Sequence, residues 1–346
     1  MRATLKDIAE QLGVSINTVS RALRDMPDIG QETKDLVRET AARLGYRKNL
    51  AASRLRTNRS LILGMVVTDI SNPVFSGMIK GVEKTCIQTS YTLMLGNSNE
   101  DSNEEAAIIS NMLDHGVDGI FLVPSMRNAD VLTQLEEARV PYVILQRKFT
   151  GKAANYVQSS DIKGGYLAAE HLYQLGHRSF LYVSAPMHIS SARERFEGFV
   201  SYLKEKGLTE SAVQIQECDG TRSGSYKVMK KWLKQHSDLK QLNATAILCF
   251  SDYVACGVYS AFAKYNLKIP QDISVVGYDN NEYSDMMLPP LTTIDIRPFK
   301  VGERASKLLL EQIDNAKTDI KPEPQEIIIS PKLVVRESTG VVERGI

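Results

Sequence analysis

The chain has few of the residues that build disulfide or metal sites. It contains four cysteines among 346 residues, and none of them forms a CxxC pair. Three of the four lie in or beside apolar segments, so we expect buried free thiols. The five histidines include no HExxH motif and no pair four residues apart. The sequence therefore gives no support for a metal site.

Long apolar runs and enzymatic motifs are also missing. No apolar run reaches the roughly 20 residues of a membrane span, and the N-terminus lacks the apolar stretch of a signal peptide. We therefore expect a cytoplasmic protein with no membrane partner. The sequence contains no GxSxG, GxGxxG or GxxxxGK[ST] segment, the usual signatures of hydrolases, dinucleotide enzymes and P-loop proteins. We expect no enzyme, no catalytic residue and no cofactor.

The first 46 residues read as three amphipathic helices. Thr4 is suited to cap the first helix, Gly13 allows a tight reversal, and Ser15 can cap the second. The third helix is expected over residues 31–44. It should close a small core through Leu36, Val37, Thr40 and Leu44.

Small polar side chains gather on the outer face of the second helix. Four of the five residues on this face are polar, and Ile16 is apolar. In order they are Ile16, Asn17, Thr18, Ser20 and Arg21. One α-helix fits the major groove of DNA, where such side chains hydrogen-bond to base edges. The alternative is three ordinary amphipathic helices with a polar outer surface. Charge favours DNA binding, because residues 1–60 hold twelve basic and seven acidic side chains, against thirty and thirty-four in the remainder.

Beyond residue 60 the pattern changes to alternating strands and helices. Apolar runs that fit strands recur at 61–67, 91–95, 119–123, 142–145, 180–183, 213–217, 246–250 and 273–276. Helical segments such as 73–88 and 104–115 separate them. This alternation is typical of doubly wound parallel sheets. Two such sets in series predict two α/β lobes.

Eight segments occur in the order seen in one known family. They are TLKDIAEQLGVSINTVSRAL, GYRKNLAASRLRT, GMVVTDISNPVF, GVDGIFLVPS, GGYLAAEHLYQLGHR, SARERFEGF, IPQDISVVGYDN and PPLTTIDI. With them the chain resembles the LacI/GalR family of bacterial transcription regulators over nearly its full length. The resemblance implies an all-α helix-turn-helix DNA-binding head and an α/β periplasmic-binding-protein-like core of two doubly wound parallel-sheet lobes.

The resemblance also implies three domains. They are a helix-turn-helix head (1–46), a hinge (47–60) and an effector-binding and dimerisation core (61–346). Three crossings between the lobes are expected near Asp161, Pro290 and Ile320. The first lobe would then hold about 61–161 and 291–320, and the second about 162–290 and 321–340.

The hinge carries five basic and no acidic side chains between residues 47 and 59, so it can lie along phosphates. It resembles family hinges that become helical on DNA and wedge a leucine into the minor groove, here Leu55. The expected DNA-binding residues are Thr4, Ser15, Ile16, Asn17, Thr18, Ser20, Arg21, Asn49 and Leu55.

Ligands of open parallel sheets bind beyond the carboxyl ends of the strands. Arg195 and Asp279 follow strands and match family positions that hold the effector. A guanidinium and a carboxylate suit a polyhydroxylated ligand, although the two residues could instead pair with each other as scaffolding. The expected effector-binding residues are Asp69, Phe75, Gln146, Ser191, Arg195, Ser251 and Asp279.

Several positions depart from the family pattern. Gln146 stands where many members have Asp, Ser251 where sugar-binding members often have Asn, and no aromatic residue lies near Gly220. A carbohydrate effector is expected from the family, with a purine or nucleoside as the alternative. The resemblance implies a homodimeric repressor that reads a pseudo-palindromic double-stranded DNA operator. A sugar-binding protein of the same core fold without DNA binding is the other alternative, and the head argues against it.

Overall fold

The computed structural model describes residues 3–46, 59–127, 129–235, 244–316 and 323–342. The chain forms two compact units, Met1–Ser60 and Leu61–Ile346, and each is described by itself. In the part of the chain described, no helix combines the length and apolar character needed to cross a membrane.

The first unit is a three-helix head with α1 (Leu5–Leu12), α2 (Ile16–Ala22) and α3 (Gln31–Arg43). The predicted caps are confirmed. Thr4 and Asp7 form a reciprocal capping box at the start of α1, and Ser15 accepts a hydrogen bond from the Thr18 backbone N–H at the start of α2. Gly13 ends α1 in the left-handed conformation, with φ of 67°.

The core of the head differs from the prediction at one position. The buried apolar residues are Ile8, Ala9, Val19, Ala22, Val37 and Ala41. Leu36, predicted to be inside, is 49% exposed. Val37, Thr40 and Ala41 share one face of α3, and Leu36 points about 100° away from Val37. The prediction of Leu36 as a core residue was therefore wrong.

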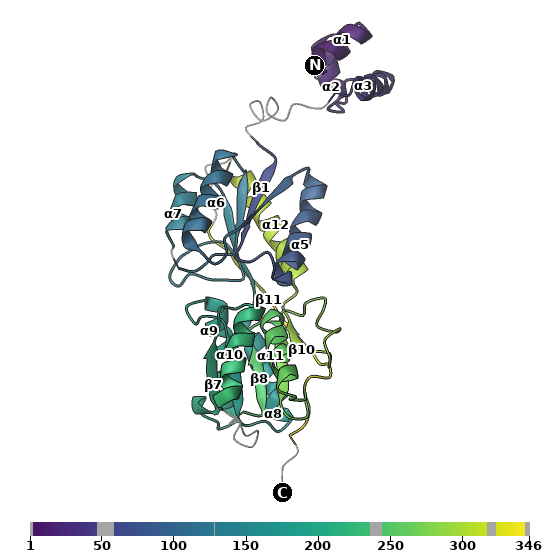
Figure 1. Ribbon diagram of the computed structural model, residues 1–346. Helices are drawn as coiled ribbons and strands as arrows, with labels where there is room; N and C mark the ends of the chain where they lie inside the picture. The colour runs from purple at the N-terminus through teal and green to yellow at the C-terminus, as the bar shows by residue number, and fades with distance from the viewer. Residues whose placement is uncertain (1–2, 47–58, 128, 236–243, 317–322, 343–346) are drawn as a thin grey trace. The chain divides into compact units, whose positions relative to one another are not determined.

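The second unit contains two six-stranded sheets. The first sheet has the strands β1 (Ile62–Val67), β2 (Thr92–Asn97), β3 (Gly119–Leu122), β4 (Tyr142–Leu145), β5 (Tyr156–Ser159) and β11 (Glu326–Ile329). Its order is β11-β5-β4-β3-β1-β2, and all neighbours are parallel. Its helices are α5 (Pro73–Thr89), α6 (Ser102–Asp114), α7 (Asp130–Glu137) and α12 (Pro298–Asn315). Figure 1 shows α5 and α12 on one face of this sheet and α6 and α7 on the other.

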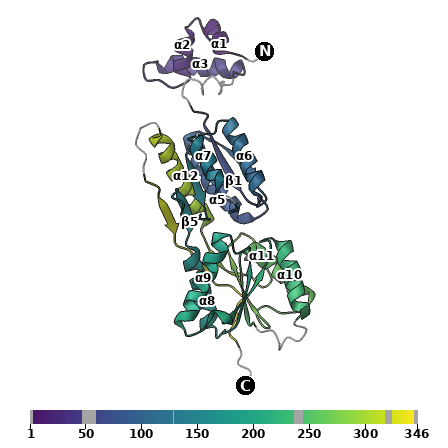
Figure 2. The ribbon, with the colours of Figure 1, turned by 90° about the vertical axis from the view of Figure 1, so that its left-hand side faces the viewer.

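The second sheet has the strands β6 (Phe180–Ser184), β7 (Val213–Glu217), β8 (Ala246–Cys249), β9 (Ser274–Tyr278), β10 (Thr292–Asp295) and β12 (Lys332–Val334). Its order is β12-β10-β9-β8-β6-β7, and only the short β12 is antiparallel to its neighbour. Its helices are α8 (Asp161–Gln174), α9 (Ser190–Glu205), α10 (Arg222–Gln235) and α11 (Asp252–Lys264). Helices α8 and α9 cover one face, and α10 and α11 cover the other (Figure 2).

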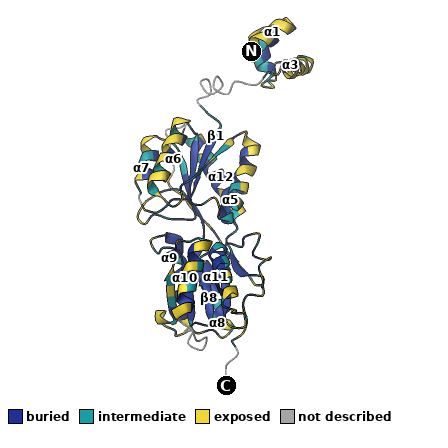
Figure 3. Ribbon diagram, in the orientation of Figure 1, coloured by how far each residue is buried: buried dark blue, intermediate teal, exposed yellow. Residues whose placement is uncertain are grey.

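Burial follows from this layering. The central strands are enclosed on both faces, while the outer sides of the helices are exposed (Figure 3). This explains why the strands read as nearly continuous apolar runs in the sequence. Cys86, Cys218 and Cys249 are buried and free, as expected from their apolar surroundings, and Cys256 is partly buried.

Two of the predicted lobe crossings were misplaced. The first crossing lies between β5 and α8, next to Asp161 as predicted. The strand β10 belongs to the second lobe, because Thr292 pairs in register with Val276 of β9, so the chain crosses after β10 and not near Pro290. The strand β11 belongs to the first lobe, because Glu326 pairs with Tyr156 of β5. The third crossing therefore follows β11 and does not lie near Ile320.

Candidate functional site

A cleft lies between the carboxyl ends of the two sheets. It encloses about 690 Å³ of space between the two walls, part of it open to solvent. Its walls come from the segments that directly follow β1, β2, β3 and β4 in the first lobe and β6, β7, β8, β9 and β10 in the second. The position agrees with the general rule for open parallel sheets.

Six of the seven predicted effector residues line this cleft. They are Asp69, Phe75, Gln146, Ser191, Arg195 and Asp279. Ser251 does not line it. Its side chain is buried and caps α11 by accepting a hydrogen bond from the Val254 backbone N–H, with 3.1 Å between the atoms. A serine directly before a helix satisfies a free N–H group there, so Ser251 is turned toward the helix and away from a ligand.

Arg195 is the central charged group of the second-lobe wall. Its Nε donates to Asp161 Oδ1 over 2.8 Å, and a terminal N–H donates to the Phe250 carbonyl oxygen. Its Nη2 lies 3.8 Å from Asp279 Oδ1. The guanidinium also lies over the rings of Tyr278 and Phe250, with 3.7 and 4.6 Å to the ring centroids. Arg195 thus pairs with Asp279 and with backbone, as the scaffolding alternative requires, while both residues also line the cleft.

The electrostatics of this wall follow from burial. Burial raises the pKa of Asp279 well above its usual range, and Arg195 offsets this only in part. Burial raises the pKa of Asp161 as well. Burial also disfavours the charge of Arg195, but Asp161, Tyr278, Asp279 and Tyr182 together outweigh that effect and raise its pKa, so the arginine stays protonated. One guanidinium is therefore shared by two buried carboxyl groups, and Asp279 has φ of 108°, a backbone conformation that non-glycine residues rarely adopt.

Gln146 provides a free donor on the first-lobe wall. Its Oε1 accepts a hydrogen bond of 2.8 Å from the Ser159 backbone N–H. Its Nε2 is buried and has no hydrogen-bond partner among the residues the structure describes. Leaving a buried donor unpaired costs about 1–3 kcal/mol. A ligand whose acceptor atom bonds to Nε2 would remove that cost on binding. Gln146 has a left-handed backbone conformation, with φ of 58°, in the position where its side chain bonds to Ser159.

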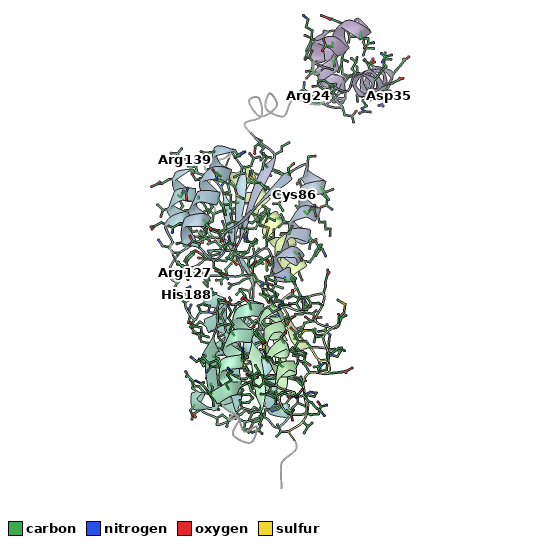
Figure 4. All side chains as sticks on the ribbon, viewed as in Figure 1. Arg24, Asp35, Cys86, Arg127, Arg139 and His188 are labelled. Atoms are coloured by element: carbon green, nitrogen blue, oxygen red, sulfur yellow. The ribbon has the colours of Figure 1, made fainter. Side chains whose placement is uncertain are left out.

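Arg147, the second arginine of the cleft, already pairs with a carboxylate of the protein. Arg147 donates to both carboxylate oxygens of Glu100 over 2.6 and 2.8 Å, and to the Pro124 carbonyl oxygen over 2.7 Å. Burial disfavours the charge of Glu100, but Arg147 outweighs it and holds the pKa of Glu100 below its usual range. Figure 4 shows His188 at the end of the second lobe that faces the first.

Several cleft residues were missed at the sequence level. Glu100, Asp219 and Phe250 line the cleft, and each follows a strand, so the strand-end rule could have found them. The predicted Phe75 lines the cleft, whereas Phe149 packs in the core of the first lobe. No aromatic residue occupies the position of Gly220, as the sequence indicated.

The outer face of α2 carries the predicted DNA-binding side chains. Ile16 is 49% exposed, Asn17 is exposed, and Thr18, Ser20 and Arg21 are partly exposed. Thr4 and Ser15 serve as helix caps. Asn49 and Leu55 lie outside the described residues, and their roles stay predictions.

A helix-turn-helix head and a two-lobed α/β core with a polar cleft define a ligand-responsive DNA-binding regulator. Residues 4–49 match the family described as bacterial regulatory proteins, lacI family, and residues 169–339 match the periplasmic binding protein-like domain. The chain belongs to the LacI family of helix-turn-helix transcriptional regulators.

Relatives of the whole chain agree with this assignment. The HTH-type transcriptional repressor PurR of Klebsiella pneumoniae is 32% identical over 340 residues, which cover 98% of this chain and 97% of that protein. The lac repressor dimer bound to operator and the anti-inducer ONPF is 25% identical with a TM-score of 0.84, covering 98% of this chain and 100% of that one. A LacI-family regulator from Enterococcus faecalis with bound ribose is 29% identical with a TM-score of 0.71, covering 82% of this chain and 100% of that one. The chain is a DNA-binding repressor of this family with an effector-binding core, and it is not an enzyme.

Proposed function

We propose that the protein is a cytoplasmic homodimeric repressor whose affinity for its operator is set by a carbohydrate bound in the cleft. The observation that carries the carbohydrate assignment is that polar side chains line the cleft from both lobes. Arg195 and Asp279 offer a donor and an acceptor from the second lobe, and the free Nε2 of Gln146 offers a donor from the first. Each hydroxyl of a sugar both donates and accepts, so it can use such a mixed set.

The charge of the cleft favours a neutral ligand. Its lining includes the acidic side chains Asp69, Glu100 and Asp219, besides Asp279, whose raised pKa favours the neutral form. The two arginines of the lining, Arg147 and Arg195, already pair with carboxylates. A phosphate group would therefore meet repulsion without a free cation among the lining residues. This argues for a sugar or glycoside over a sugar phosphate.

A purine or nucleoside is the second candidate. Phe75 lines the cleft and offers a flat apolar surface to a base. Repressors named PurR are among the relatives that align over nearly the whole chain. A base also carries ring nitrogens that could accept a hydrogen bond from Gln146 Nε2.

For the DNA, we propose that α2 reads base edges in the major groove through Ile16, Asn17 and Arg21. Two heads related by a two-fold axis would read two half-sites, because protein and operator then share their symmetry. A solved relative is a repressor dimer bound to operator, which supports the homodimer. Thr18 and Ser20 would contact the backbone beside the bases.

Coupling between cleft and DNA requires a ligand that favours one arrangement of the lobes. The cleft residues come from both lobes, so a ligand that contacts both walls stabilises the arrangement that brings them together. Its effect on operator affinity equals its differential affinity for the two states, typically about 1–3 kcal/mol.

The experiment is a thermal-shift screen of the full chain with sugars, glycosides, sugar phosphates and purines. A ligand raises stability by RT ln(1 + [L]/Kd), so we expect a neutral sugar or glycoside to raise the unfolding temperature. Stabilisation by purines alone would replace the carbohydrate with the second candidate. Operator binding is tested in parallel by selection from a randomised DNA library, in which the absence of any enriched sequence would favour the sugar-binding protein without DNA function.

A further inference from the structure

Two aspartates in the turn that joins α2 to α3 form ion pairs with these helices. Asp25 has left-handed backbone, with φ of 60°, and its carboxylate lies 3.0 Å from both Lys34 Nζ and Arg38 Nη2 of α3. Asp28, three residues later, lies against the opposite helix. Its Oδ2 is 2.5 Å from Arg21 Nη2 in the last turn of α2. The contacts of Asp25 thus hold the turn against α3, and Asp28 follows in the same turn.

Arg21 is held at the surface that faces DNA in the proposed function. It lies one helical turn beyond Asn17 on the outer face of α2. Its side chain is 35% exposed, and its Nε is buried without a hydrogen-bond partner in the described head. The side-chain hydrogen bond with Asp28 raises the pKa of Arg21 and lowers that of Asp28. The guanidinium therefore has one fixed partner, and its remaining N–H groups are available at the surface.

We propose that Asp28 is a positioning residue for base reading, which holds the Arg21 guanidinium in the orientation that recognises a guanine. The proposal rests on the proposed function of α2. A guanidinium has five N–H donors in a rigid plane. One bond to Asp28 leaves enough donors for the O6 and N7 acceptors of guanine, which arginine binds in a bidentate manner.

An acidic residue at a DNA-facing surface repels phosphates regardless of sequence. That repulsion weakens binding to every sequence equally. A free arginine side chain loses rotamer freedom when it binds a base, and this costs free energy. Holding Arg21 in place beforehand avoids that cost, and only sequences with guanine opposite Arg21 benefit. Asp28 therefore increases the ratio of specific to non-specific binding while lowering general affinity.

The opposite role is also physically possible and makes the proposal testable. Asp28 could compete with DNA for the guanidinium, in which case its removal would strengthen the contact with guanine. The two roles predict opposite changes in base preference. They predict the same change in general affinity, so affinity for one DNA sequence cannot distinguish them.

The test uses the full chain and operators selected from a randomised library. The Arg21→Lys variant first identifies the guanine position that depends on Arg21, because lysine lacks the bidentate fork. At that position we expect Asp28→Asn to lose about five- to tenfold of the preference for guanine, with unchanged or tighter binding to non-operator DNA. Asp35→Asn is the matched control, since it removes the same charge from α3 at a position that contacts Gln31 and Arg38 and not Arg21. Figure 4 labels Asp35 on the head.

The outcomes separate the proposals. If Asp28→Asn keeps or increases the guanine preference, Asp28 does not position Arg21. An equal loss in Asp35→Asn would attribute the effect to the removed charge and would also overturn the proposal. The Asp28→Glu variant keeps the carboxylate, so it should retain more of the preference than Asp28→Asn, and equal losses in both would also overturn the proposal. If Arg21→Lys changes the preference at no position, the proposed reading by α2 is itself wrong.

Discussion

Arg195 Nη2 and Asp279 Oδ1 lie 3.8 Å apart in the second-lobe wall of the cleft, too far for a direct hydrogen bond. Arg195 makes its close contacts elsewhere, with Asp161 and the Phe250 carbonyl oxygen. A ligand hydroxyl beside this pair can therefore accept from the guanidinium and donate to the Asp279 carboxyl group.

This geometry predicts the effect of Asp279→Asn. We expect the affinity for the effector to fall by about two- to tenfold, because burial favours the neutral form of Asp279 and a hydrogen bond between neutral groups is worth roughly 0.5–1.5 kcal/mol. Operator affinity in the absence of effector should stay unchanged, since a separate compact unit reads the DNA. Calorimetric titration of the effector and fluorescence anisotropy of operator DNA measure the two affinities. Wild-type effector affinity in this variant would assign Asp279 to the scaffold.

The free amide of Gln146 predicts a second effect on the ligand. Gln146→Leu removes the Nε2 donor and also the acceptor for the Ser159 backbone N–H, so we expect weaker effector binding together with a loss of stability. Gln146→Glu keeps the acceptor and removes the donor. It should retain most of the stability and still weaken effector binding, as measured by thermal unfolding with and without ligand. Unchanged ligand affinity in both variants would show that the amide does not contact the effector.

The corrected role of Ser251 gives a contrasting prediction. Because its side chain caps α11, Ser251→Ala should lower the free energy of unfolding by about 1 kcal/mol. Effector affinity should remain at the wild-type value, since the side chain does not line the cleft. Denaturant unfolding and ligand titration measure the two quantities. A change in effector affinity without a change in stability would return Ser251 to the binding site.

Glu105 predicts a pH dependence of stability. Its carboxylate is buried and accepts a hydrogen bond of 2.6 Å from the Ser125 backbone N–H. Burial raises its pKa to about 7 from the ordinary 4.5. Between these values the folded state binds more protons than the unfolded state, so the free energy of unfolding falls as the pH rises through this window.

The non-titrating variant Glu105→Gln should lose less stability than wild type between pH 5 and 8. The difference is at most about 3 kcal/mol, measured by denaturant unfolding at the two pH values. Glu137→Gln, at an exposed position of α7, is the control and should follow the wild type. Parallel pH profiles for Glu105→Gln and wild type would show that this carboxyl group titrates normally.

The sequence identified most of the cleft because one rule covers it. Side chains that follow parallel strands meet at one edge of a sheet, so Asp69, Gln146 and Asp279 could be selected without knowing any contact. Ser251 also follows a strand, but its assignment to the binding site was wrong. A serine directly before a helix accepts a hydrogen bond from a free backbone N–H there, and Ser251 does so. The direction of a side chain depends on such local competition, which residue order alone does not reveal.

The lobe boundaries were harder to predict for a different reason. The strands β10, β11 and β12 are three or four residues long, and their order in the sequence does not say which sheet each one joins. Their membership depends on pairing with distant strands, as between Glu326 and Tyr156. The pair of Arg21 and Asp28 likewise depends on the path of the turn after α2, and only the structure shows it.

The most direct test of the central claim is the operator affinity of the full-length wild-type protein with and without saturating effector. The operator comes from the library selection and the effector from the thermal-shift screen. We predict that the effector changes the operator Kd by about five- to 150-fold, which corresponds to roughly 1–3 kcal/mol of coupling, and that Asp279→Asn shows the change only at higher effector concentration. An operator Kd that is the same with and without a ligand known to saturate the cleft would contradict control of DNA binding by the cleft.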